Sequence, residues 1–346
     1  MRTRSRWRIG AALTLLLCAP GALWAQAAAP YYYPPDAVAA LYRDHTAPLA
    51  RAFAEQAPTL VQALQGHCAG PAALAPARAA WTQTLLAWER LAAVAVGPLI
   101  ERRSLREIDF QPLRPELLKR ALAREPKTLD DMERVGTPAK GLPAIEHLLW
   151  SAPAAPRSGA CAYAVLAAQA VQREAEALRA AFDALAAAPP EEEAAVTAFV
   201  AFINQWLGGL ERLRWTGMEK PLREAETRGA APAFARLPSG QTGAAWAAGW
   251  AELRALARQP DSGAPAIGAG RVSIESYLRG RGHIALADRW RATVDEADRA
   301  MQGVQPGVPA SVDAAARTLK KLTTLMQSEV AGSLEVNLGF SSADGD

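Results

Sequence analysis

The sequence has few of the residues and patterns on which common catalytic sites depend. Its 346 residues include four histidines and three cysteines. It contains no His-Glu-x-x-His zinc motif, no glycine-rich phosphate loop and no Gly-x-Ser-x-Gly nucleophile elbow. His45, His67 and His283 show no spacing typical of metal ligands. No stretch has sustained alternation of β-branched residues, so the pattern of a β-sheet is also missing.

Long apolar runs are missing beyond the N-terminus, where no segment has about 18 consecutive apolar residues. At the N-terminus itself, four arginines precede the short apolar run Ile9–Leu17, and small residues follow. This order is typical of a secretory signal peptide, with cleavage after Ala25 or Ala27. We therefore assign residues 1–27 to a cleaved signal and expect a mature chain with no transmembrane segment.

The chain also lacks the excess of basic residues that nucleic-acid binding requires. Its formal charge of +3 includes the four arginines of the signal and no signal acid, so the mature chain is close to −1. We expect no nucleic-acid partner.

Two cysteines, Cys68 and Cys161, remain after cleavage of the signal. An even number of cysteines in an oxidising compartment favours a disulfide between them. The alternative is two separate buried thiols.

What the chain has in abundance is alanine within amphipathic segments, which predicts an all-α protein. Proline- and glycine-rich loops separate these segments, notably at 151–160, 229–243 and 259–270. The expected helices cover residues 36–65, 77–96, 161–187, 191–216, 243–258, 283–302 and 309–331.

About 320 mature residues exceed one ordinary core, so we expect two helical-bundle domains. Pro189-Pro190 followed by three glutamates stops one helix and begins the next, which places the boundary between 28–188 and 189–346. A faint repeat suggests that the halves arose by internal duplication. It pairs Glu89-Arg90-Leu91 with Glu211-Arg212-Leu213.

The same repeat pairs Gly141-x-x-x-Ile145-Glu146 with Gly270-x-x-x-Ile274-Glu275. Glu146 lies beside the apolar face of the predicted helix in 141–150, and a half-buried carboxylate needs a cation, a metal or a hydrogen-bond donor. One hypothesis is a binding site between the halves that uses Glu146 and Glu275, with Arg90 and Arg212 as counter-charges. The other is a structural salt bridge from Glu146 to Arg90.

The segment GLPAIEHLLW, residues 141–150, resembles the G-x-H-x-x-E signature of the imelysin family. The run WTQTLLAWERLAAVAVGP, the segment Ile108–Pro112 and the ending LGFSSADGD are similar to further family segments in the same order. The resemblance implies an all-helical protein of the periplasm with a role in iron uptake, and it carries a metallopeptidase label. It implies iron as the ligand and an iron-transport component of the cell envelope as a partner.

The sequence departs from the family at Pro143, which stands where the motif has its histidine and which offers no ligand atom. Pro143 also suits the first turn of a helix. His147 lies about 100° around the helix from Glu146 and cannot replace the missing ligand, so we interpret it as a packed side chain. A metal site here would be built on Glu146.

Oxygen ligands for iron or calcium are available at Asp109, Asp344 and Asp346, although the last two equally suit a solvated tail. The candidate binding residues are thus Glu146, Arg90, Asp109, Glu275 and Asp344, with no catalytic residue assigned. A hydrolytic metal centre needs about three protein ligands and an open position, and Pro143 removes one. We therefore expect a non-catalytic binding or accessory protein of iron acquisition. The alternatives are a metallopeptidase and an interaction scaffold with a degenerate metal site.

Overall fold

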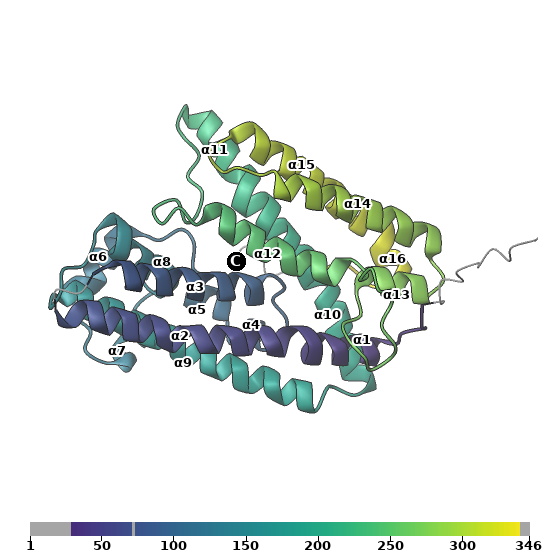
Figure 1. Ribbon diagram of the computed structural model, residues 1–346, viewed down its shortest axis with the longest axis horizontal. Coiled ribbons are helices and arrows are strands. Elements are labelled where there is room, and N and C mark those ends of the chain that lie inside the picture. The colour runs from purple at the N-terminus through teal and green to yellow at the C-terminus, as the bar shows by residue number, and fades with distance from the viewer. Residues whose placement is uncertain (1–28, 71–72, 340–346) are drawn as a thin grey trace, which may run out of the picture.

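The computed structural model describes residues 29–70 and 73–339, and it has no β-strand in that part of the chain (Figure 1). The all-α fold expected from the sequence is therefore confirmed. No helix in the described ranges combines the length and the apolar character needed to cross a membrane. The proposed signal peptide falls outside the described residues.

The N-terminal half consists of three long helices and several short ones. In chain order these elements are α1 (Pro34–Leu41), the π-helical turn η1 (Tyr42–Thr46), α2 (Ala47–Ala69), α3 (Ala75–Ala92), α4 (Pro98–Glu101), α5 (Ser104–Asp109), α6 (Pro115–Ala123), α7 (Leu129–Glu133), the 3₁₀ turn η2 (Thr137–Ala139), α8 (Gly141–Glu146), the π-helical turn η3 (His147–Ser151) and α9 (Gly159–Ala187).

The C-terminal half has the same character. Its elements are α10 (Glu192–Glu211), the π-helical segment η4 (Arg212–Glu219), α11 (Lys220–Arg228), α12 (Thr242–Ala257), α13 (Ile274–Gly280), α14 (Ile284–Gln302), α15 (Pro309–Leu325), the π-helical turn η5 (Met326–Val330) and α16 (Ala331–Ser333).

The expected long helices agree with these bounds to within a few residues. The main difference is the helix expected over 77–96, which ends at Ala92 ahead of Gly97, a residue with φ of 49°. The segment expected over 191–216 continues past Glu211 as the π-helical η4. Neither the earlier end of the first helix nor the change to π-helix in the second is visible in apolar spacing.

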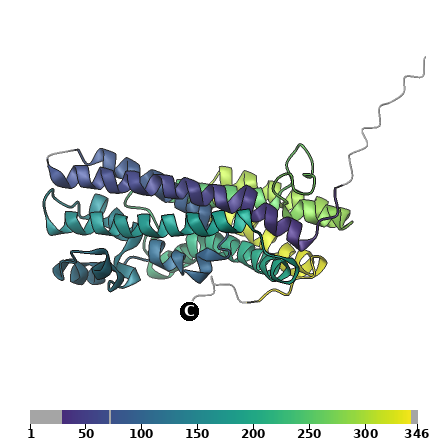
Figure 2. The same ribbon diagram turned by 90° about the horizontal axis from the view of Figure 1, so that it is seen from below.

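Packing joins the two halves along their length. Helices α2, α3 and α9 lie side by side in the lower part of Figure 1, and α12, α14 and α15 lie in the upper part. Helix α3 packs on α12, and α1 packs on α10, so contacts cross the proposed boundary (Figure 2). The buried side chains of both halves form one continuous cluster. The division into 28–188 and 189–346 falls at the turn between α9 and α10 and stays a prediction.

The structure does not bring the two members of the proposed duplication together. Helix α8, which carries Glu146, packs on α9 and α3, whereas α13, which carries Glu275, packs on α14 and α12. The two helices lie at opposite sides of the molecule in Figure 1. A single site that uses both glutamates is therefore wrong, and the duplication itself stays a prediction.

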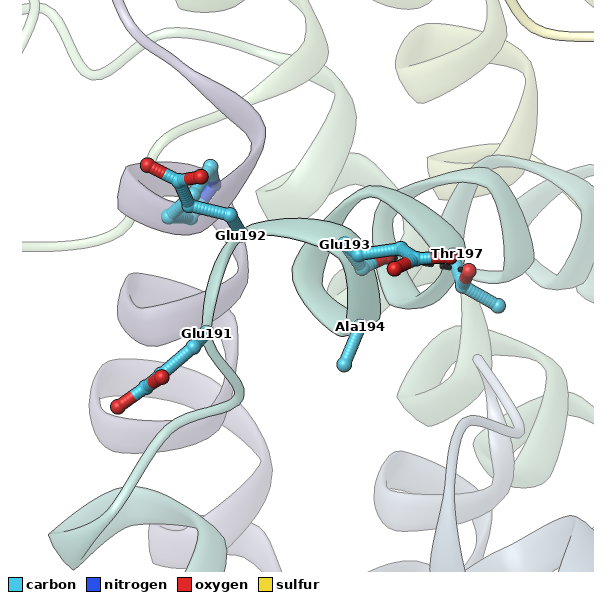
Figure 3. A pocket seen from close by; sticks show the side chains of 6 residues that line it. Glu191, Glu192, Glu193, Ala194 and Thr197 are labelled. Carbon is cyan, nitrogen blue, oxygen red and sulfur yellow. Dashed lines mark hydrogen bonds between the residues drawn. The ribbon is translucent and has the colours of Figure 1, made fainter.

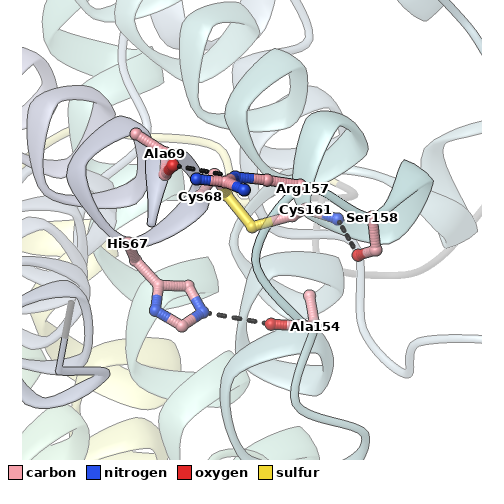
Figure 4. The surroundings of a disulfide bond; sticks show 7 residues. All are labelled: His67, Cys68, Ala69, Ala154, Arg157, Ser158 and Cys161. Atoms are coloured by element: carbon pink, nitrogen blue, oxygen red, sulfur yellow. Dashed lines mark hydrogen bonds between the residues drawn. A yellow bond between two sulfur atoms is a disulfide. The ribbon is translucent and has the colours of Figure 1, made fainter. Parts of the chain in front are cut away.

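The expected disulfide is present between Cys68, near the end of α2, and Cys161, in the first turn of α9 (Figure 4). Hydrogen bonds hold the same corner: the Arg157 amide donates to the Cys68 carbonyl at 3.0 Å, and the Cys161 amide donates to Ser158 Oγ at 3.1 Å. The disulfide therefore ties the end of one long helix to the start of another.

We predict that replacing both cysteines by alanine lowers the free energy of unfolding by about 3–5 kcal/mol, because the bond closes a long loop in the unfolded chain. The loop spans a sequence separation of 93. Urea denaturation of wild-type and C68A/C161A protein measures the difference. An unchanged midpoint and slope would contradict it, and thiol titration of the unfolded, non-reduced mature protein should find no free thiol.

Candidate functional site

Helix α8 starts in direct contact with the end of α5, and Gly141 makes that contact possible. Gly141 has φ of 71°, in the left-handed region that favours glycine. A Cβ atom at this position would lie 2.2 Å from the Ile108 carbonyl oxygen. Any side chain would therefore separate the two helices. The close approach brings Asp109, the last residue of α5, to the side of α8 that carries Glu146.

Glu146 is the last residue of α8 and is only 5% exposed. Its Oε1 accepts hydrogen bonds from the hydroxyl of Ser239 at 2.6 Å and from the Ser239 amide at 3.2 Å. Its Oε2 lies 3.7 Å from Nη1 of Arg236. Both partners belong to the loop between α11 and α12, so Glu146 connects the two halves of the chain.

Arg236 is the centre of the cluster, and its side chain is 2% exposed. Its Nη2 donates to Asp109 Oδ2 and lies 3.6 Å from Glu89 Oε1. The guanidinium also lies over the ring of Trp81, 5.8 Å from the centroid, in cation–π geometry. Three carboxylates from α3, α5 and α8 thus share one buried guanidinium. We call Glu89, Asp109, Glu146 and Arg236 the carboxylate cluster.

A second guanidinium, that of Arg212, approaches the cluster from η4. Its Nη2 donates to the carbonyl of Ala92 and, at 3.2 Å, to that of Ala93. This contact depends on Gly209, where a Cβ atom would lie 2.0 Å from the Ala93 carbonyl oxygen. Burial lowers the pKa of Arg212, while Glu89 and Asp109 oppose that shift. With all groups ionised, three carboxylates face two guanidinium groups.

Burial, together with this excess of negative charge, shifts the protonation of Glu89. Burial raises its pKa from 4.5 to about 7, and repulsion from Asp109 adds to the shift, while Arg236 and Arg212 oppose it. For Arg236, burial disfavours the charged form, but the carboxylates of Asp109, Glu89 and Glu146 outweigh it and leave the pKa raised. Arg236 therefore stays charged, and Glu89 is the group that takes up a proton near neutral pH.

The cluster does not fit a metal ion. In the described ranges, no three His, Cys, Asp or Glu side chains are placed to hold one. Pro143 is buried in the first turn of α8 and offers no ligand atom. The guanidinium of Arg236 lies between the carboxylates that would otherwise be the ligands.

The sequence-predicted residues have different outcomes. Glu146 is buried with an arginine within 4 Å, as expected, and Asp109 belongs to the same cluster. The counter-charge is Arg236, so the expected salt bridge from Glu146 to Arg90 is wrong. Arg90 is exposed. Asp344 lies outside the described residues, as does Asp346.

Glu275 is fully buried but belongs to a separate ion-pair group. Its Oε1 lies 2.8 Å from Arg279 Nε and 2.8 Å from Arg291 Nε, and its Oε2 accepts from the Gln259 amide at 2.8 Å. These partners satisfy the carboxylate locally. Nothing in this group connects it to the carboxylate cluster.

Apolar spacing and motifs do not reveal Arg236 and Ser239, because both lie in the proline- and glycine-rich loop at 229–243. The available signal was the composition of residues 229–241, where a single arginine follows Phe234 in an otherwise apolar and small-residue stretch. Apolar neighbours favour burial of this arginine, and a buried arginine needs acidic partners.

A surface hollow of about 1090 Å³ at the start of α10 is lined by Pro35, Glu191–Glu193, Ala194 and Thr197 (Figure 3). Its glutamates point in different directions and suit the positive end of the helix dipole, as expected. Trp81 and Trp88 are fully buried and belong to the core. His147 is half-buried, in agreement with its interpretation as a packed side chain.

The all-helical fold, the motif at residues 141–150 and the carboxylate cluster define the class of helical protein, and the comparisons identify the family. The family model described as Imelysin matches residues 46–331, so the chain belongs to the imelysin family. No curated protein matches it by sequence.

Two solved structures share the fold. One is an imelysin-like protein from Psychrobacter arcticum 273-4, with a TM-score of 0.71 and 18% identity over 89% of this chain and 97% of that one. The other is described as a putative iron-regulated protein A precursor from Parabacteroides distasonis, with a TM-score of 0.71 and 13% identity over 87% of this chain and 94% of that one.

We predict that Glu146→Ala lowers the free energy of unfolding by about 3 kcal/mol, because a buried guanidinium loses one carboxylate and Ser239 loses its acceptor. Glu116→Ala, at an exposed position of α6, is the control and should change stability by less than about 0.5 kcal/mol. Urea denaturation of both variants measures the effects. Equal stability of the two variants would refute the structural role of Glu146.

We predict that the stability of the Glu89→Gln variant relative to wild type increases as the pH rises. Because the pKa of Glu89 is raised from 4.5 to about 7 on folding, the folded state binds its proton more tightly than the unfolded chain does. The wild-type protein therefore loses stability as the pH rises through this window. Between pH 5 and pH 8 the stability of the variant relative to wild type should increase by on the order of 2 kcal/mol.

Denaturation curves at pH 5, 6, 7 and 8 measure this trend. Glu55→Gln, at an exposed position of α2, is the matched control and should show no such trend. A difference between Glu89→Gln and wild type that stays constant across the four pH values would show that Glu89 does not titrate in this window.

Proposed function

We propose that this imelysin-family protein is a periplasmic accessory protein of iron acquisition that performs no catalysis and acts through a site around Glu146. The observation that carries the proposal is the position of Arg236, whose guanidinium lies within 4 Å of three carboxylates. A buried cluster neutralised in this way has no vacant coordination position at which a metal-bound water would attack a peptide.

The loss of the motif histidine argues in the same direction. Pro143 supplies no imidazole, and the remaining side chains of the cluster are oxygen donors, which suit zinc less well than nitrogen or sulfur donors do. A zinc peptidase also needs a general base beside the metal-bound water. Two of the three carboxylates, those of Asp109 and Glu146, are held by Arg236 and Ser239.

Three observations support the link to iron acquisition in the periplasm. The chain belongs to the imelysin family, and one similar structure is described as an iron-regulated protein A precursor. The Cys68–Cys161 disulfide fits an oxidising compartment outside the cytosol. The N-terminal sequence has the order of a signal peptide. Iron, or an iron-transport component of the cell envelope, is the partner that this role requires.

An interaction scaffold with a degenerate metal site is the second candidate. It is favoured by the way the carboxylate cluster ties α3, α5 and α8 to the loop between α11 and α12. In that case the surface of the protein, rather than the cluster, contacts the partner.

The proposal predicts that a strain lacking the protein grows more slowly than its parent under iron chelation, and that the wild-type gene restores growth. Protein purified from the periplasm should hold less than stoichiometric zinc after dialysis and should show no chelator-sensitive proteolysis. Equal growth of the two strains would contradict the role in iron acquisition. Stoichiometric zinc together with chelator-sensitive proteolysis would establish the metallopeptidase instead. Complementation by a folded Glu146 variant separates the first candidate, which needs Glu146, from the scaffold, which does not.

A further inference from the structure

We propose that a hollow between η1 and the loop that precedes α13 is a binding site for a small zwitterion, an amino acid or a short peptide. The guanidinium of Arg271 would bind the carboxylate of the ligand, and Asp44 would bind its ammonium group. The lining residues follow α1 or precede α13, whereas Glu146 lies on α8, at the opposite side of the molecule from α13 (Figure 1). The hollow is therefore separate from the carboxylate cluster, and the inference does not depend on a role in iron acquisition.

The hollow has the size of a small-molecule site and a wall of short side chains. Its volume is about 500 Å³, within the range of ligand pockets in proteins. Apart from Asp44 and Arg271, the lining comes from the loop between Pro260 and Gly270, where each lining residue is a proline, serine, glycine or alanine. Because these side chains are short, the space beside the two charged groups stays open.

Contacts at the start and in the middle of this loop hold it in place. At its start, the Gln259 amide donates to Oε2 of the buried Glu275 at 2.8 Å. In its middle, the hydroxyl of Tyr32, a fully buried residue, donates to the Pro265 carbonyl. The wall of the hollow is therefore formed before a ligand binds, and a preformed site avoids the entropic cost of ordering a loop on binding.

Arg271 is a half-buried cation that forms no ion pair with any carboxylate among the described residues. Its Nε donates to the Ala255 carbonyl at 3.0 Å, while its Nη1 and Nη2 donate to no described residue. Burial lowers the pKa of the guanidinium, and the charges of Glu252 and Asp44 oppose that shift without cancelling it. A charge withdrawn from water in this way is stabilised by an anion. The planar guanidinium suits a carboxylate, which it can bind through two parallel hydrogen bonds.

Asp44 supplies the opposite charge to the same hollow, and it does not pair with Arg271. Its carboxylate accepts hydrogen bonds from Arg43 Nε at 3.0 Å and from Arg43 Nη2 at 2.6 Å. The Asp44 side chain is 27% exposed, and an ionised carboxylate has about four lone-pair sites, so it can accept further hydrogen bonds from an ammonium group. The hollow thus presents an anion and a cation that are held apart. A ligand that carries both charges complements each of them, whereas a ligand with one charge leaves the other unmatched.

The test measures the binding of L-alanine and of L-alanyl-L-alanine to the mature protein by isothermal titration calorimetry. We expect at least one of these two probes to bind at one site per chain with a Kd below about 1 mM. The forms of that probe that are acetylated at the amino group or amidated at the carboxylate should bind about tenfold more weakly or worse, because each loses one hydrogen-bonded charge contact.

Matched variants locate the site. Arg271→Gln and Asp44→Asn should each weaken binding of the unmodified probe by about tenfold or more. Ala269→Trp, at an exposed position of the lining, should weaken binding by filling the hollow while both charges remain. Arg124→Gln and Glu55→Gln, at exposed positions of α6 and α2, remove one charge of each sign elsewhere and should leave binding unchanged. Circular dichroism checks that each variant is folded.

Three results would overturn the proposal. The first is the absence of binding of either probe to the wild-type protein at concentrations up to about 10 mM. The second is equal binding of the acetylated form, which would show a site for a simple anion. The third is unchanged binding in a folded Arg271→Gln or Asp44→Asn variant, which would place the site elsewhere. If neither of these variants folds, Ala269→Trp decides the question, because unchanged binding in that variant would exclude the hollow.

Discussion

The neutralisation of one buried guanidinium is the constraint on which this arrangement of helices depends. Removing a charge from water costs several kcal/mol, so Arg236 is stable at its position only if acids surround it. Those acids come from α3, α5 and α8, while Arg236 comes from the loop that precedes α12. The relative positions of four elements are thereby coupled to one side chain. The backbone of Arg236 has φ of 68°, a conformation that a non-glycine residue adopts at a cost and that its buried contacts must offset.

The charged residues of the cluster can meet because two glycines, which have no side chain, let neighbouring helices approach closely. Gly141 lets α8 touch the Ile108 carbonyl, and Gly209 lets α10 touch the Ala93 carbonyl. Each contact ends beside a charged residue of the cluster, Asp109 in the first case and Arg212 in the second. Arg212 also begins a π-helical segment, a feature that often re-aims side chains at functional sites. Backbone proximity therefore sets the charge geometry, and the ion pairs then hold it.

Much of the fold could be predicted from the sequence because its signals are local. Apolar spacing and the proline- and glycine-rich loops located α9, α12 and α14 to within a few residues, and the expected oxidising compartment predicted the Cys68–Cys161 bond. The burial of Glu146 followed from its place beside Leu142 and Ile145. Its partner could not be predicted, because Arg236 lies about 90 residues away in a loop without periodicity. The expected partner, Arg90, lies on α3 next to Glu89, but that helix turns Glu89 toward the cluster and Arg90 toward solvent.

The position of Arg236 also changes how the proline at position 143 is interpreted. A cluster of carboxylates without an imidazole ligand is still an array of negative charges that are partly or fully withdrawn from water, and such an array is unstable unless a cation accompanies it. A metal ion and a guanidinium both satisfy that electrostatic need, but only the metal ion offers an open position for a water molecule or a substrate. The ion pairs of Arg236 with Glu89, Asp109 and Glu146 therefore hold the helices together electrostatically, and Pro143 adds no imidazole to them. The charge that joins the helices and an open coordination position are thus separable properties, because a guanidinium supplies the first and not the second.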